Sequence, residues 1–243
     1  MKAIIPAAGH GTRFLPVTKA VPKEMLPIGS KPALELIVDE AKSAGADEII
    51  LIISHGKELI REYFKDDPAI RFVYQEEQRG LGHAILQASS LVSGSSSRLL
   101  ILLGDCLVAG CNAAKAMAEV SAAHGGASVI GLERVPPEKV SRYGIVRMED
   151  GRIVDLVEKP APEEAPSDLA IAGRYLLDTR IFDYLRTQTP GKGGEIQLTD
   201  AIRRMIGGGD AAALLGYVYP GKRQDIGNPK GYFEALRAMG ANE

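Results

Sequence analysis

The sequence predicts an α/β protein with a mostly parallel sheet that is covered by helices on both faces. First, continuous apolar runs that are typical of buried strands recur along the first 133 residues. Second, segments with helical period separate these runs, which gives consecutive strand–helix–strand units. Third, the rhythm changes after Glu133, where we predict a second, β-rich lobe.

The elements of the first part follow one another in regular order. Strands are predicted at 2–7, 48–54, 71–75, 98–105 and 127–133, and helices at 31–45, 82–92 and 112–124. In the first of these helices the apolar residues Leu34, Ile37, Val38 and Ala41 share one side. The strand RLLILLGD at 98–105 is the most continuously apolar one, which favours a central place in the sheet.

The lobe is expected to contain a hairpin. In YGIVRMEDGRIVDLVEKP, residues 143–160, the pair Asp150–Gly151 suits the positive φ that a tight turn requires. Surface loops are expected at 94–98, 160–168 and 206–210. Because no strong boundary is visible, we predict one domain over 1–243, made of a core at 1–133 and a second part at 134–243.

Composition excludes several classes of protein. The 243 residues are 45% hydrophobic, enough for a substantial core, and carry 29 Lys plus Arg against 31 Asp plus Glu. With a net charge of −2, we expect neither a nucleic acid nor an anionic membrane as partner. The apolar start is too short for a signal peptide, so the cytoplasm is the expected location. Cys106 and Cys111 lie apart from any histidine cluster, and we expect both to be reduced and structural.

The stretch AAGHGTRFLPVTKAVPKEM, residues 7–25, has the composition of a phosphate-binding turn. Its glycines expose backbone N–H groups to an anion, Arg13 offers a planar fork for two phosphate oxygens, and Lys19 and Lys23 add charges on flexible stems. It lacks both the GK[ST] ending of a P-loop and the GxGxxG spacing of a dinucleotide site. The glycines alone are more often part of a turn required only for packing, and it is the TR, TK and PK that follow them which favour phosphate.

A set of motifs resembles the sugar-1-phosphate nucleotidyltransferase family. The run GxGTRFLPxTKxxPKEMLPIxxKP starts at Gly9, and its PKEMLPI part is especially similar to the bacterial uridylyltransferases that use UTP and glucose-1-phosphate. The resemblance continues in order through GLGHAI (80–85), LLGD (102–105), SRYGIV (141–146), VEKPAPEEAPSDLAIAGRY (157–175), GGEIQLTDAI (193–202) and GKRQDIGNPKGY (221–232). It covers nearly the whole chain. It implies a Rossmann-like nucleotide-diphospho-sugar transferase fold, in which the core binds the nucleotide and the lobe binds the sugar.

The resemblance implies that a sugar-1-phosphate oxygen attacks the α-phosphorus of a nucleoside triphosphate in line, which gives a nucleotide sugar and pyrophosphate. UTP and glucose-1-phosphate are the favoured substrates, and Mg²⁺ is the expected cofactor. Such a reaction needs positioning and charge neutralisation more than proton transfer, because a phosphate monoester with a second pKa of about 6 is already largely ionised. A chain with only four histidines and no nucleophile beside a base fits this chemistry.

The family motifs assign roles residue by residue. The catalytic residues would be Arg13, Lys23, Asp105, Lys159 and Asp225, of which Asp105 and Asp225 would hold the metal. The nucleotide would contact Ala7, Ala8, Gly9, Gly11, Thr12, Gln75 and Gly80, and the sugar Gly144, Glu158, Gly173 and Glu195. Without the resemblance, Asp105 would be interpreted as a helix cap, Asp225 as a turn residue and Glu158–Lys159 as a solvated pair.

Several residues of the motifs carry more specific expectations. Gln75 has both a donor and an acceptor and can read the edge of a pyrimidine. Because Lys159 precedes Pro160, we expect an extended backbone that sends neighbouring side chains to opposite faces. His83 is given no catalytic role, and Thr199 and Asp200 are interpreted as a helix start rather than as ligands.

The chain also departs from the uridylyltransferases that it resembles. Its connections at 64–70 and between YGIV and VEKP are shorter, which affects the expected homodimer or homotetramer and the rim of the sugar pocket. Cys106 stands where relatives often have a second acid, so weaker Mg²⁺ binding is a hypothesis. The alternatives are the same chemistry with dTTP or another sugar-1-phosphate, and a nucleotide-sugar binding module without turnover.

Overall fold

The computed structural model describes residues 1–92, 98–208 and 214–239. The loops predicted at 94–98 and 206–210 therefore lie partly outside the described residues. Within the described residues, no helix is long and apolar enough to cross a membrane.

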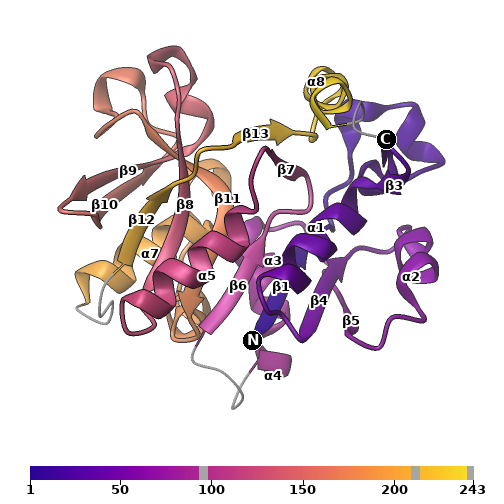
Figure 1. Cartoon of the computed structure of the whole chain (residues 1–243), viewed down its shortest axis with the longest axis horizontal. Helices are drawn as coiled ribbons and strands as arrows, with labels where there is room; N and C mark the ends of the chain where they lie inside the picture. The colour runs from indigo at the N-terminus through magenta and orange to yellow at the C-terminus, as the bar shows by residue number, and fades with distance from the viewer. Residues whose placement is uncertain (93–97, 209–213, 240–243) are drawn as a thin grey trace.

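A mixed sheet of nine strands forms the centre of the described part of the chain (Figure 1). In spatial order the strands are β5 (Ile70–Tyr74), β4 (Glu48–Ile53), β1 (Lys2–Pro6), β6 (Arg98–Leu102), β11 (Leu169–Asp178), β8 (Ser128–Arg134), β12 (Leu214–Val218), β10 (Arg152–Glu158) and β9 (Gly144–Glu149). The pairings from β5 to β6 are all parallel, as is the pairing of β8 with β12. The predicted α/β class and the five predicted strands of the first part are confirmed.

The sheet is mixed because β11 runs against β6 and β8, and β10 runs against β12 and β9. The chain leaves β8 at Arg134, passes through β9 and β10, and begins β11 at Leu169, which is paired with Arg134. A strand that starts beside the end of its neighbour must return in the opposite direction, so β11 is antiparallel to β8 and also to β6. The predicted parallel arrangement thus describes the first four strands and the β8–β12 pair, but not the lobe.

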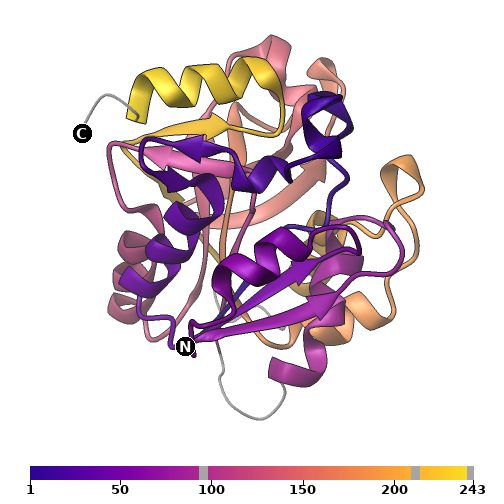
Figure 2. The same ribbon diagram turned by 90° about the vertical axis from the view of Figure 1, so that its right-hand side faces the viewer.

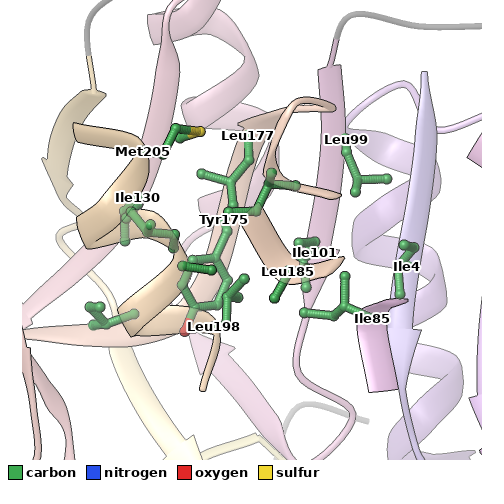
Figure 3. Packing of buried hydrophobic residues seen from close by; sticks show 14 of the residues in the cluster. Ile4, Ile85, Leu99, Ile101, Ile130, Tyr175, Leu177, Leu185, Leu198 and Met205 are labelled. Atoms are coloured by element: carbon green, nitrogen blue, oxygen red, sulfur yellow. The ribbon is translucent and has the colours of Figure 1, made fainter. Parts of the chain in front are cut away.

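Helices cover both faces of the sheet (Figures 1 and 2). They are α1 (Ala33–Ser43), α2 (Glu58–Phe64), α3 (Leu81–Gln87), α4 (Ser89–Val92), α5 (Ala113–Ala123), α6 (Ile181–Arg186), α7 (Leu198–Gly207) and α8 (Pro229–Met239). Strand β1 shows the division: Ala3 and Ile5 pack in one cluster with α1, α2 and α5, while Ile4 packs in the other with α3, α6 and α7. Figure 3 shows this second cluster around Tyr175 and Leu185.

Two predicted elements depend on the local geometry of the backbone. The helix expected at 82–92 is divided into α3 and α4, because the Ala88 N–H bonds to the Ile85 carbonyl and tightens the last turn of α3. The predicted hairpin is confirmed as β9–β10, with positive φ at Asp150 (48°) and Gly151 (79°).

Short elements complete the edge of the sheet where β1, β4 and β6 end. Strands β7 (Cys106–Ala109) and β13 (Lys222–Asp225) pair with each other, as do β2 (Pro27–Ile28) and β3 (Lys31–Pro32). Six 3₁₀ segments occur in the described residues: η1 (Thr12–Phe14), η2 (Val17–Lys19), η3 (Lys23–Met25), η4 (Pro137–Arg142), η5 (Pro162–Glu164) and η6 (Lys192–Gly194). The sequence analysis did not predict these elements, because two to six residues are too few to show a period.

Candidate active site

The glycine loop, residues 7–11, leaves the carboxyl end of β1 and turns into η1. Gly11 has φ 65°, and a Cβ there would lie 2.9 Å from Thr18 Cγ2. The Thr18 hydroxyl donates to the Gly11 carbonyl at 2.9 Å, which closes the turn. Both the positive φ and the close contact require glycine here. Arg13 follows on η1 and is exposed, so its guanidinium is available to a ligand.

A buried ion pair lies beneath this loop. Lys57 Nζ donates to both oxygens of Glu24, at 2.9 and 2.8 Å, and to the Ala7 carbonyl at 2.5 Å. Glu24 is 1% exposed and Lys57 6% exposed. Burial lowers the pKa of Lys57 in spite of the neighbouring Glu24. The sequence analysis assigned neither residue; Glu24 lies within a quoted motif, but no spacing connects it with Lys57.

Lys23 and Asp105 form a second ion pair at the mouth of the loop. Lys23 Nζ lies 2.6 Å from Asp105 Oδ2 and 3.9 Å from Glu24 Oε1. Burial opposes charge on both groups, but their attraction for each other prevails: it raises the pKa of Lys23 and lowers that of Asp105. The Lys23 ammonium group is therefore bonded to one oxygen of the Asp105 carboxylate.

The two predicted metal ligands lie side by side. Asp225 at the end of β13 is paired with Cys106 of β7, and the Ile226 N–H donates to the Asp105 carbonyl at 2.9 Å. A Cβ on Gly227 would lie 3.0 Å from Asp105 Oδ2 and also 3.0 Å from Asp225 Oδ1. Glycine therefore keeps open the space that both carboxylates border.

Two carboxylates that border one space offer the hard oxygen ligands that Mg²⁺ prefers. Asp105 Oδ2 is bonded to Lys23 and Asp225 Oδ1 accepts the Gly227 N–H at 2.9 Å, so an ion here would share these carboxylates with donors of the protein. No group of three or more His, Cys, Asp or Glu residues that could hold a metal occurs in the described residues. An ion bound by Asp105 and Asp225 would therefore take its other ligands from phosphate oxygens and water, as Mg²⁺ does in phosphoryl-transfer sites.

The residues expected to contact the base lie beside the glycine loop. The Gln75 side chain is 3% exposed and hydrogen bonds to His83 Nδ1 at 3.1 Å, which gives His83 a supporting contact rather than a free ring. The Gln78 amide donates to the Ala8 carbonyl at 3.1 Å. Gly80 has φ 99°, and a Cβ there would lie 2.8 Å from Glu195 Cβ and 2.9 Å from the Ile196 carbonyl. Gln75 thus follows β5 close to the glycine loop, whereas Gly80 packs against the segment that carries Glu195.

A cavity of about 270 Å³ opens on the other side of Asp105. We call it the sugar cavity. It is lined by the four residues predicted for the sugar, Gly144, Glu158, Gly173 and Glu195, together with Lys159, Asp105 and Asp225. Arg13, Lys23, Gln75 and Gly80 do not line it, so the predicted site residues divide into two groups that meet at the aspartates.

The backbone at Lys159 is not extended, so that prediction was wrong. Lys159 has φ 46°, in the left-handed region, and its Nζ lies 2.9 Å from Glu158 Oε1, so both side chains face the sugar cavity. Tertiary contacts override the preference that Pro160 imposes: the Lys159 N–H donates to the Tyr143 carbonyl at 3.0 Å, and Lys192 Nζ donates to the Lys159 carbonyl.

Thr199 lies in the first turn of α7, as predicted, and also lines the sugar cavity. Its hydroxyl donates to Glu158 Oε2 at 2.7 Å. The other oxygen of Glu158, Oε1, is bonded to Lys159, so the carboxylate is fixed from two sides. The helix-start pattern correctly located Thr199, but gave no signal that its hydroxyl would reach a strand residue 41 positions earlier.

The sequence analysis also missed an aromatic–cation pair in the cavity wall. The Arg223 guanidinium carbon lies 3.8 Å from the centroid of the Tyr143 ring, and Arg223 forms an ion pair with Glu133 at 2.5 Å. Both Arg223 and Tyr143 line the cavity. Arg223 lies two residues before Asp225, which is the only sequence signal that could have suggested it.

The two cysteines are free thiols. Cys106 is buried, and its Sγ lies 3.3 Å from the Ala172 carbonyl as a donor. Burial raises the pKa of the Cys106 thiol to about 12, so it stays protonated at neutral pH.

Comparison with known proteins identifies one family. The model of the nucleotidyl transferase family matches residues 2–242. A UTP–glucose-1-phosphate uridylyltransferase of Pseudomonas aeruginosa is 39% identical, over 96% of this chain and 94% of the relative. One of Staphylococcus haemolyticus is 42% identical, over 95% of this chain and 89% of the relative.

Solved structures give the same result. A UDP-glucose pyrophosphorylase in complex with UDP-glucose has a TM-score of 0.88 and 37% identity, covering 98% of this chain and 97% of its own. A UTP-bound enzyme of the same kind from Acinetobacter baumannii has a TM-score of 0.84 and 33% identity, covering 100% of this chain and 94% of its own. With the family model matching almost from end to end and the relatives matching over nearly their full length, this chain belongs to the nucleotidyl transferase family.

Proposed function

We propose that this protein joins UTP and glucose-1-phosphate to give UDP-glucose and pyrophosphate. The observation that carries the proposal is the position of Asp105 and Asp225, which both line the sugar cavity, while Asp105 is also bonded to Lys23 at 2.6 Å. Two phosphorylated substrates bound on either side would meet at these carboxylates. The names of the relatives supply the pair of substrates: UTP–glucose-1-phosphate uridylyltransferases by sequence, and structures with UDP-glucose or UTP bound.

The nucleotide side would hold the triphosphate. The N–H groups of the glycine loop and the Arg13 fork contact the phosphates, and Lys23 neutralises charge beside Asp105. Gln75 and Gly80 take the base, with Gly80 leaving the backbone open to the ring. Thr12, Ala7 and Ala8 complete the loop contacts.

The sugar side would hold glucose-1-phosphate. Glu158, fixed by Thr199 and Lys159, accepts hydrogen bonds from sugar hydroxyls, and Glu195 supplies a second carboxylate. Gly144 and Gly173 let the sugar approach the backbone. Lys159 Nζ is placed in the same cavity to contact the sugar phosphate.

The reaction itself requires alignment rather than proton transfer. A phosphate oxygen of the sugar forms a bond to the α-phosphorus, and the bond from that phosphorus to the bridging oxygen breaks, so pyrophosphate leaves with the electron pair. Arg13, Lys23 and Lys159 stabilise the charge that develops on the phosphoryl oxygens. Mg²⁺ held by Asp105 and Asp225 would supply further neutralisation and bring the two phosphates together.

The test is pyrophosphate release with Mg²⁺, measured for UTP and dTTP, each with glucose-1-phosphate, galactose-1-phosphate and N-acetylglucosamine-1-phosphate. Release chiefly from UTP with glucose-1-phosphate is expected. Release from another pair of substrates would agree with the proposed mechanism and replace the proposed substrates. If nucleotide binds but none of the six reactions releases pyrophosphate, the binding-module alternative replaces the enzyme. The oligomeric state, a homodimer or homotetramer, and a cytoplasmic location stay predictions.

A further inference from the structure

Lys57 is a buried charged residue beneath the glycine loop, and it has no role in the mechanism proposed above. It lies at the start of α2, where its own N–H bonds to the Ser54 carbonyl at 3.2 Å and its carbonyl accepts from the Ile60 N–H at 3.0 Å. Its backbone is therefore fixed to the end of β4 and to α2. A buried ammonium group is costly unless every N–H finds an acceptor.

The contacts of Lys57 lead to the proposed site in two directions. One is the 2.5 Å bond to the carbonyl of Ala7, the first residue of the glycine loop. The other is Glu24, whose carboxylate lies between Lys57, at 2.8 Å, and Lys23, at 3.9 Å. Lys23 in turn bonds to Asp105 at 2.6 Å. Four charged groups of alternating sign thus connect α2 with a proposed metal ligand.

This arrangement sets the direction of Lys23. Glu24 has two cations near it, and the closer one is Lys57. As long as Lys57 neutralises Glu24, Lys23 is free to point toward Asp105. Without Lys57, a carboxylate that is 1% exposed would have Lys23 as its nearest cation, and the cost of leaving it unpaired would draw Lys23 away from Asp105.

We propose that Lys57 is a positioning residue for nucleotidyl transfer, which fixes the glycine loop through the Ala7 carbonyl and directs Lys23 toward Asp105 through Glu24. The inference rests on the proposed function, because its effect is exerted on the triphosphate that the loop would bind.

The experiment compares Lys57→Met with the double variant Glu24→Gln/Lys57→Met. The single variant leaves a buried carboxylate without its main partner, so its melting temperature falls and turnover drops about 10²-fold, as displaced catalytic groups can cause. The double variant also removes that charge, so the melting temperature recovers. Turnover stays low and the dissociation constant of UTP, measured by calorimetry, rises about 10-fold, because the Ala7 carbonyl is still not held.

A matched control lies at the opposite end of β1. Lys2 Nζ bonds to the Leu91 carbonyl at 2.5 Å and to Glu48 at 3.1 Å, which is the same chemistry far from the glycine loop. Lys2→Met is expected to lower the melting temperature and to leave the turnover number and the UTP dissociation constant unchanged.

Wild-type turnover in Lys57→Met would overturn the proposal as a whole. A double variant in which turnover recovers together with stability would overturn the role of the Ala7 carbonyl, since Lys57 would then act only by neutralising Glu24. If Lys57→Met does not fold, the double variant alone decides. A wild type without pyrophosphate release would refute the proposed function instead, and the dissociation constant of UTP would still test how Lys57 holds the loop.

Discussion

The glycine loop and the sugar cavity are built in opposite ways. The loop and its lysines come from one continuous stretch, residues 7–25, and rest on the buried pair of Lys57 and Glu24. The cavity draws its lining from strands, helix starts and turns between residues 81 and 225. The charged residues at 13, 19 and 23 are all cations, whereas the cavity combines carboxylates with cations, and its Glu158 is fixed by neighbouring donors.

Because of this difference, the two regions are suited to different kinds of contact. A loop with several cations over a buried ion pair suits phosphates, which are bound by charge. A cavity with oriented carboxylates suits hydroxyl groups, which are bound by direction. Asp105 and Asp225 lie where the two regions meet. Substitutions at these aspartates, in the loop and in the cavity should therefore change different kinetic constants.

The largest effect is expected at the boundary. Asp105→Asn and Asp225→Asn each remove a carboxylate that faces both regions, and turnover should fall on the order of 10³-fold, because charge neutralisation carries most of such a reaction. Pyrophosphate release at saturating UTP and sugar phosphate measures this. Circular dichroism serves as the control for folding. Near-normal turnover in either variant would remove that residue from the mechanism.

On the loop side, Arg13→Ala should lower kcat/KM for UTP about 10²-fold and leave KM for the sugar phosphate almost unchanged. Since Arg13 is exposed, the free energy of unfolding should change by no more than about 0.5 kcal/mol. Arg61→Ala, at an exposed arginine of α2, is the matched control and should behave as the wild type. An equal rise of KM for both substrates would contradict the division between loop and cavity.

On the cavity side, Thr199→Val removes the hydroxyl that fixes Glu158. KM for the sugar phosphate should rise about 10-fold, which corresponds to about 1.4 kcal/mol, close to the lower end of the roughly 1.5–3 kcal/mol of one hydrogen bond to a charged group. KM for UTP should stay the same, and Thr199→Ser should restore the wild-type value. A Thr199→Val variant whose UTP constant changes as much as its sugar constant would show that the regions are not separable.

The smallest effect is expected from Cys106→Asp. The new carboxylate would line the same cavity as Asp105 and Asp225, and the activity should reach half its maximum at a Mg²⁺ concentration lower by a few fold. Cys106→Ser is the control without charge. If a Mg²⁺ titration shows the same midpoint for all three proteins, the hypothesis that Cys106 weakens metal binding fails.

The two regions also differ in how far sequence could predict them. Strand and helix periods predicted the core, and the residue types in 7–25 pointed to phosphate without any family knowledge. The cavity became predictable only through the resemblance, because Gly144, Glu158, Gly173 and Glu195 share no local pattern. Their proximity arises from β11, which returns antiparallel and brings these segments together.

The errors and omissions have a common physical origin. Lys159 adopts a positive φ because hydrogen bonds from distant segments outweigh the preference set by Pro160. Lys57 was missed because a lysine in a polar turn is usually exposed, and only the fold buries it against Glu24. Tertiary contacts decided each case, and a single sequence carries no signal for them.

Gly80 has one more consequence. Around it two segments exchange backbone hydrogen bonds: the Gly82 N–H donates to the Ile196 carbonyl at 2.8 Å, and the Ile196 N–H donates to the Arg79 carbonyl at 2.8 Å. The segment expected under the base and the segment carrying Glu195 are therefore fixed to each other through their backbones. If both segments bind substrate as proposed, a nucleotide that shifts the first would also shift the second, and linkage would then require the sugar phosphate to change nucleotide binding by the same factor.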